Sequence, residues 1–169
     1  MKLKTPAIAV LSLALVAPLA LLARADSASL PGASATPTAD QSTTSKLVYG
    51  LLSDSRYAYR PQALDDALSQ DIFKRYLEAL DGGKQYFTAA DIEKFGPYKT
   101  ELDDAIRSGE LAPAYDIFGV YKQRVGERTA YARALLKQDF DFSGDQRWEY
   151  DREKAPWAGN PQELDAVWK

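Results

Sequence analysis

The residue types that do chemistry in proteins are unevenly represented in this chain of 169 residues. It has no histidine and no cysteine. This excludes Ser-His-Asp triads, Cys-His dyads, disulfides and metal sites built on imidazole or thiolate. Any catalysis would therefore rest on carboxylate, Ser/Lys, Thr or Tyr chemistry.

The clearest metal-binding pattern is half of an EF-hand calcium loop, in which Asp139, Asp141 and Ser143 precede Gly144. Hard oxygen ligands would close on a hard cation, and the glycine would make the turn. The twelfth position of such a loop supplies a bidentate glutamate, but here it is Tyr150. Because the ligand set falls short, we predict a turn in which Asp and Ser side chains cap backbone groups, and no metal.

Two acidic pairs, Asp65-Asp66 and Asp103-Asp104, contain the carboxylates that acid–base catalysis uses. Adjacent residues on a helix do not converge on a point, so we expect both pairs on solvent-facing helix surfaces. Ser143 and Lys154 form a formal Ser/Lys pair, but nothing marks Ser143 as a nucleophile on a strained turn. We predict no catalytic residue and no cofactor.

Aromatic side chains near the end of the chain could stack on sugar rings, as in a cell-wall-binding protein: Trp148, Tyr150, Trp157 and Trp168. Such residues more often anchor an irregular segment to a helical core or to another domain. We favour anchoring and keep cell-wall binding as an alternative.

Residues 1–25 have the features of a secretory signal peptide. Lys2 and Lys4 precede an uncharged run of 16 residues, and Ala23 and Ala25 occupy the positions that a signal peptidase reads. The run is shorter than the roughly 20 residues of a spanning helix, which makes an uncleaved anchor the weaker alternative. Cleavage would leave 18 basic against 24 acidic residues, a balance that argues against a nucleic-acid surface.

The next segments predict a linker followed by helices. Residues 26–45, rich in Ser, Ala, Thr and Pro, are expected to form a disordered linker. A first helix is predicted over residues 46–57. A second begins at Pro61, carries apolar residues at i, i+4 spacing and ends at Asp81-Gly82-Gly83.

Two further helices and an irregular segment complete the pattern. A third helix begins at Thr88 and bends or splits at Gly96-Pro97, and a fourth spans about residues 111–137. Gly119 and Gly126 inside the fourth helix predict close helix packing. Residues 139–159 lack the helical periodicity of apolar residues but contain several aromatic side chains, so we expect an ordered irregular segment.

The fold class is therefore all-α: a small orthogonal bundle of about four to five helices with an irregular aromatic-rich C-terminal segment. The side chains expected to be buried are Phe73, Tyr76, Leu77, Leu80, Phe118 and Tyr121. Asn160 and Pro161 start a last helix, whose apolar half-stripe of Leu164, Val167 and Trp168 is expected to be the least ordered part.

Three stretches together resemble the N-terminal helical domain of the tail-specific, or carboxy-terminal processing, proteases. The first runs from Ile72 to Asp81 and continues with Lys84 to Thr88 and Asp91-Ile92. The second runs from Arg107 to Leu111 and on to Tyr115 to Phe118, and the third is Asp151 to Trp157. The resemblance covers residues 46–169, and we expect this domain to be incomplete at its C-terminus.

The resemblance implies a serine endopeptidase of the Gram-negative periplasm, with a PDZ domain that binds apolar C-terminal tails and a catalytic domain with a Ser/Lys dyad. It implies that the helical domain helps to enclose protein substrates and that, in some members, a lipoprotein adaptor docks on the protease. No family catalytic residue has a counterpart here, so we expect an N-terminal fragment without activity of its own. A free-standing periplasmic adaptor or inhibitor is the alternative from another class.

Overall fold

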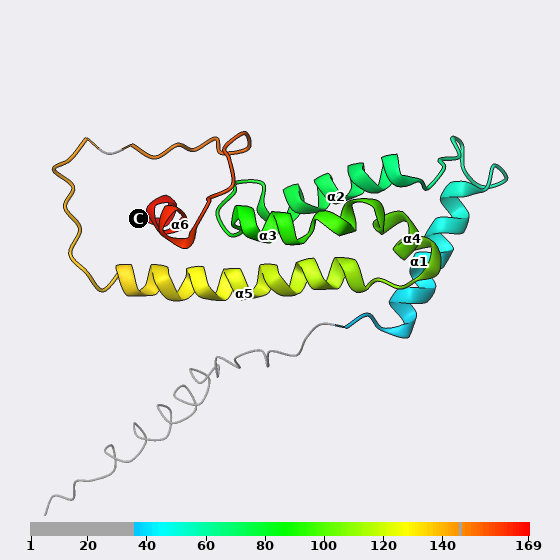
Figure 1. Cartoon of the computed structure of the whole chain (residues 1–169), viewed down its shortest axis with the longest axis horizontal. Coiled ribbons are helices and arrows are strands. Elements are labelled where there is room, and N and C mark those ends of the chain that lie inside the picture. The colour runs from blue at the N-terminus through cyan, green and yellow to red at the C-terminus, as the bar shows by residue number, and fades with distance from the viewer. Residues whose placement is uncertain (1–35, 146) are drawn as a thin grey trace, which may run out of the picture. The chain divides into compact units, whose positions relative to one another are not determined.

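The computed structural model describes residues 36–145 and 147–169, and in them it confirms the all-α class (Figure 1). The predicted signal peptide, with Ala23 and Ala25, and residues 26–35 of the predicted linker lie outside the described residues. The elements are α1 (Ala39–Ser53), α2 (Asp66–Asp81), α3 (Ala89–Lys94), the 3-10 helix η1 (Gly96–Thr100), α4 (Leu102–Ser108), α5 (Ala112–Leu135) and α6 (Pro161–Trp168). Within the described ranges, none of these helices combines the length and the apolar character that a membrane crossing requires.

Helix α1 corrects the predicted start of order near Lys46, because it begins at Ala39. Thr38 and Gln41 form a reciprocal capping box that starts it. The hydroxyls of Ser42 and Ser45 donate to the carbonyls of Gly109 and Ile106, 2.8 and 2.9 Å away. The composition of this stretch predicted disorder because it has few apolar groups, but its small polar side chains attach the helix to α4.

Helix α2 starts later than predicted, at Asp66 instead of Pro61. Asp65 takes the N-cap position, and its carboxylate accepts the backbone N–H of Leu68 at 3.0 Å. The helix ends at Asp81, before Gly82, as the glycine pair predicts.

The third predicted helix is split, as the sequence indicated, into α3, η1 and α4. Thr88 and Asp91 form the capping box of α3, and Pro97 lies in the first turn of η1. Gly109 ends α4 in the left-handed region with φ 77°. A Cβ there would lie 2.8 Å from the Ser42 carbonyl oxygen, so glycine permits both the turn and the close approach of α1.

Helix α5 matches the predicted fourth helix, but its glycines do not mediate close packing. A Cβ added at Gly119 or Gly126 would meet nothing within 4 Å. The inward side also differs, since Ile117 is fully buried while Phe118 and Tyr121 are only half-buried.

The segment between α5 and α6 is irregular, as predicted, but most of its aromatics are not anchors. Phe142 and Tyr150 are 89% and 92% exposed, and Phe140 and Trp148 are also exposed. Only Trp157 packs against the core, beside the Thr88–Ala158 bridge in which the Ala89 N–H donates to the Ala158 carbonyl at 2.8 Å.

Helix α6 is docked, which corrects the expectation that its half-stripe is the least ordered part. Leu164 is 2% exposed, and the indole N–H of Trp168 donates to the Gln85 carbonyl at 2.7 Å. The Trp168 ring also meets Tyr86 edge-to-face, with centroids 5.6 Å apart. The packing partner that a short helix needs therefore lies in the loop between α2 and α3.

One apolar cluster holds α2, the following loop, α3, η1, α4 and α5 together: Phe73, Leu77, Phe87, Phe95, Leu102 and Ile117. The predicted burial of Phe73 and Leu77 is confirmed at 4% and 6% exposure. Tyr76, Leu80, Tyr121 and Trp157 pack against this cluster but are half-buried, so the expected burial of the first three is only partial. Phe118 is also half-buried and contacts the Tyr121 ring.

Candidate functional site

A groove of about 490 Å³ lies along α2. We call it the lysine groove. Its apolar side consists of Phe73, Leu77, Ile92 and Trp157, and its charged side chains are Asp71, Lys74, Glu78, Lys84 and Lys99. Apolar surface with a few placed charges is the usual composition of a binding site.

Lys84 enters the groove from a hydrogen-bonded turn after α2. The buried carboxylate of Asp81 accepts the backbone N–H groups of Gln85, Tyr86 and Phe87 at 2.7, 2.9 and 2.9 Å. Burial raises the pKa of Asp81, and these three hydrogen bonds and the Lys84 charge offset only part of that shift. Lys84 itself adopts a left-handed conformation with φ 52°.

Trp157 forms the opposite wall of the groove. Its ring lies 6.1 Å from the Phe87 ring, centroid to centroid, and the Lys84 ammonium lies 4.5 Å from the Trp157 ring centroid. Such a cation–π contact favours an ammonium held above an indole face. The backbone bridge at Ala158 fixes this wall to the start of α3.

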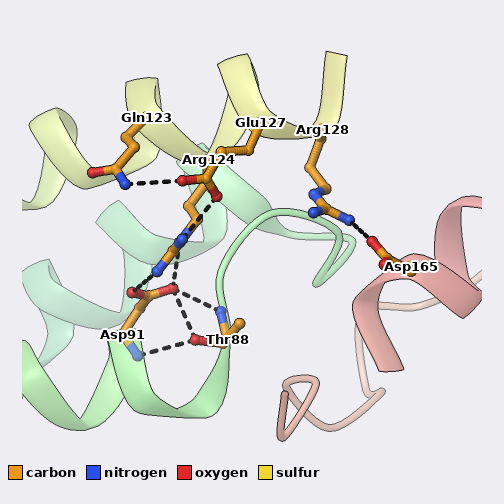
Figure 2. A network of polar contacts seen from close by, with 7 residues as sticks. All are labelled: Thr88, Asp91, Gln123, Arg124, Glu127, Arg128 and Asp165. Carbon is orange, nitrogen blue, oxygen red and sulfur yellow. Dashed lines mark hydrogen bonds and ion pairs between the residues drawn. The ribbon is translucent and has the colours of Figure 1, made fainter. Parts of the chain in front are cut away.

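A polar network joins α3 to α5 (Figure 2). Arg124 donates from Nη2 to Asp91 Oδ1 at 2.8 Å and from Nε to Oδ2 at 2.9 Å, and its Nη1 contacts Glu127 at 2.8 Å. Asp91 Oδ2 also accepts the backbone N–H and the hydroxyl of Thr88. Gln123 adds a hydrogen bond to Glu127.

The electrostatics of this network favour the charged forms. Burial alone would raise the pKa of Asp91, but the Arg124 guanidinium and the Thr88 donors outweigh it and leave the pKa below its ordinary value. The hydrogen bond to Asp91 in turn raises the pKa of Arg124. The pair is therefore a structural tie, since neither group is poised to exchange a proton near neutral pH.

A second tie joins α5 to α6, where Arg128 Nη1 contacts the Asp165 carboxylate (Figure 2). Arg128 is 9% exposed, and its Nε has no hydrogen-bond partner among the described residues. Tyr131 lies under the guanidinium, 5.1 Å from its carbon to the ring centroid. This arginine was not predicted, because a charged residue at an inward helix position is not recognisable without its partner.

The structure brings the two acidic pairs together around one hollow, but not as a catalytic pair. The hollow is lined by both pairs and by Arg107. Asp65 caps α2, and Arg107 contacts Asp104 at 2.9 Å and Asp103 at 3.8 Å. The solvent-facing prediction is wrong for Asp103, which is 3% exposed because α4 turns it toward α2.

The half calcium loop forms a local turn. The Asp141 carboxylate accepts the backbone N–H and the hydroxyl of Ser143, at 2.9 and 2.6 Å, and these bonds lower its pKa. The Ser143 hydroxyl is therefore donated to Asp141, which is the predicted backbone-capping turn. Among the sugar-stacking candidates, Trp157 and Trp168 are engaged within the fold, and Trp148 and Tyr150 are exposed.

Three residues at the centre of the core were not among the predicted core residues. They are Phe87, Phe95 and Ile117, which are 0–1% exposed. Phe87 follows the turn organised by Asp81, and its burial depends on that turn. Ile117 lies next to Phe118, which the sequence predicted to be buried on this helix. The sequence contains this apolar residue at a helical position, but the buried face of α5 differs slightly from the predicted face.

Comparison with known proteins gives two matches. The family described as the tail-specific protease N-terminal domain matches residues 51–169. A tail-specific protease of Haemophilus influenzae is 37% identical over 111 residues, which cover 65% of this chain and 16% of that relative. The chain therefore spans a small part of the relative's length. Both matches agree with the resemblance predicted from the sequence.

Proposed function

Since this chain belongs to the tail-specific protease family, as its N-terminal domain, we propose that it is a non-catalytic helical part of a periplasmic serine protease. In this role it shapes the chamber that receives protein substrates and supports contacts with other domains or with an adaptor protein. The whole protein would cleave periplasmic proteins that it recognises by apolar C-termini. The signal-peptide pattern of residues 1–25 supports the location.

The observation that carries the contact role is the exposed apolar face of α1. Four neighbouring side chains on this helix are 42–63% exposed: Leu47, Val48, Leu51 and Leu52. The helix attaches to α4 through Ser42 and Ser45, so this apolar face is left without a partner in the described part of the chain. Contiguous exposed apolar surface marks interaction sites, and the remainder of the protease is the proposed partner.

The described residues support a non-catalytic role. Ser143, the formal nucleophile candidate, donates its hydroxyl to Asp141, while Asp65 caps α2 and Asp103 and Asp104 contact Arg107. We expect the purified chain to leave a peptide with an apolar C-terminus intact. Hydrolysis that persists in a preparation made from a host lacking its own tail-specific protease would contradict the proposal.

A binding experiment tests the α1 contact directly. The chain is mixed with the part of the Haemophilus influenzae relative outside the matched segment, and complex formation is measured by co-purification and by anisotropy. We expect binding that Leu51→Asp weakens by about tenfold or more, because a charge would be buried in an apolar contact. Leu136→Asp is the matched control, since Leu136 is 74% exposed at the end of α5. Equal binding by both variants would contradict the role of α1.

A further inference from the structure

Lys84 is a nearly buried cation whose charge acts on the Asp81 carboxylate of the same turn, but the two groups form no direct ion pair. Its exposed fraction is 9%, and within the described part of the chain its ammonium contacts the Gly82 carbonyl, at 3.4 Å, and the Trp157 ring. No carboxylate lies within 4.0 Å of it among residues 36–145 and 147–169. Lysines this deeply buried are normally paired, so the position predicts an external anion.

The backbone at Lys84 supports the same conclusion. Its φ of 52° places a long side chain in the left-handed region, which glycine or asparagine occupies at lower cost. The Asp81 carboxylate, nearby in the turn, already accepts three backbone N–H groups. The turn therefore holds the Lys84 ammonium at the groove, while the Asp81 carboxylate is occupied by backbone N–H groups.

The rest of the lysine groove is complementary to an anion attached to an apolar group. Lys99 is a second ammonium without a carboxylate within 4.0 Å in the described ranges, and it lies 6.0 Å from the Phe73 ring centroid. Lys74, by contrast, is near Glu78 at 3.9 Å. Of the groove's carboxylates, only Asp71 then opposes the two unpaired lysines. The apolar surface of Leu77 and Trp157 lies in the same groove.

We infer that the lysine groove binds a polypeptide segment in which acidic side chains flank a large apolar side chain. The apolar side chain packs against Trp157 and Leu77, one carboxylate pairs with Lys84, and a second pairs with Lys99. Local charge complementarity selects the partner, because the Lys84 and Lys99 ammonium groups line the same groove as apolar surface and have no carboxylate within 4.0 Å among the described residues. This site lies on elements other than α1 and does not depend on the proposed interdomain contact.

The test uses a fluorescein-labelled peptide with blocked termini and the core Glu-Leu-Phe-Asp, titrated with the purified chain and followed by anisotropy. The neutral peptide Gln-Leu-Phe-Asn is the matched ligand. We expect the acidic peptide to bind with Kd below ~1 mM and the neutral one at least about tenfold more weakly. Added salt should weaken binding of the acidic peptide.

Variants identify the groove as the site. Lys84→Gln and Lys99→Gln should each weaken binding by about tenfold, whereas Lys94→Gln, an exposed lysine on α3 outside the groove, should not. Circular dichroism checks folding, and Lys99→Gln decides the result if Lys84→Gln does not fold. Absence of binding, equal binding of both peptides, or an effect of Lys94→Gln as large as those of the groove variants would overturn the inference.

Discussion

Arg124 on α5 and Asp91 on α3 form a two-pronged ion pair, with N–O distances of 2.8 and 2.9 Å. The same carboxylate closes the capping box with Thr88, so one side chain both starts α3 and ties it to α5. Asp91→Ala should therefore lower the free energy of unfolding by about 3 kcal/mol, because it strands a partly buried arginine. Urea denaturation measures this, with the exposed Glu93→Ala on the same helix expected to change stability by less than about 0.5 kcal/mol.

The stability of the fold should also depend on the protonation of Asp91. Its pKa in the folded state is below the ordinary value of about 3.9. The contribution of ionised Asp91 to the free energy of unfolding is thus fully present above the pKa of the unfolded state. It is lost as the pH falls through the pKa of the folded state. Between about pH 5 and pH 2, the wild-type chain should lose stability more steeply than Asp91→Asn. Parallel curves from urea melts at several pH values would show that this pair does not couple to folding.

Phe73 lies in the apolar cluster at 4% exposure. Phe73→Ala should lower the free energy of unfolding by about 3–5 kcal/mol, because it removes buried apolar surface and leaves a cavity. Phe142→Ala is the matched change at a side chain 89% exposed and should cost less than about 0.5 kcal/mol. An unchanged melting temperature for Phe73→Ala would refute the core described above.

The two kinds of glycine should respond oppositely to alanine. Gly119→Ala should raise the free energy of unfolding by about 1 kcal/mol, because the site is helical and open. Gly109→Ala should lower it by about 1 kcal/mol or more, because a Cβ at φ 77° would also lie 2.8 Å from the Ser42 carbonyl oxygen. Faster proteolysis within α1 in Gly109→Ala, absent from Gly119→Ala, would locate the effect. A stabilising Gly109→Ala would be the contrary result.

Trp168 attaches α6 through its indole N–H to the Gln85 carbonyl. Trp168→Phe keeps a ring beside Tyr86 but removes the N–H donor. It should lower the free energy of unfolding by about 1–2 kcal/mol. Hydrogen exchange of the α6 amides should accelerate in this variant. Phe142→Leu changes a side chain that is 89% exposed and should leave the exchange of α6 unaltered. Similar exchange in both variants would mean that the indole hydrogen bond does not hold the helix.

Local sequence features predict much of the fold. The glycines after Asp81, the Thr88 and Asp91 capping box and the break at Gly96-Pro97 predict where helices start and stop, and the structure agrees. The buried stripe of Phe73 and Leu77 also follows from spacing. These features depend on residues within a few positions of each other, so the sequence alone contains them.

Features that join distant segments needed the tertiary structure. Several contacts link residues that are 37 to 73 positions apart in the sequence. They are the hydrogen bonds from the α1 serines to the α4 end, the Arg128–Asp165 ion pair and the contact of Lys84 with Trp157. The sequence determined the all-α class, the family, the end of α2, the starts of α3 and α6 and the approximate span of α5, because caps and apolar periods are local. Which face of a helix is covered, and which lysine lacks a partner, depends on what packs opposite it, and only the folded chain decides that.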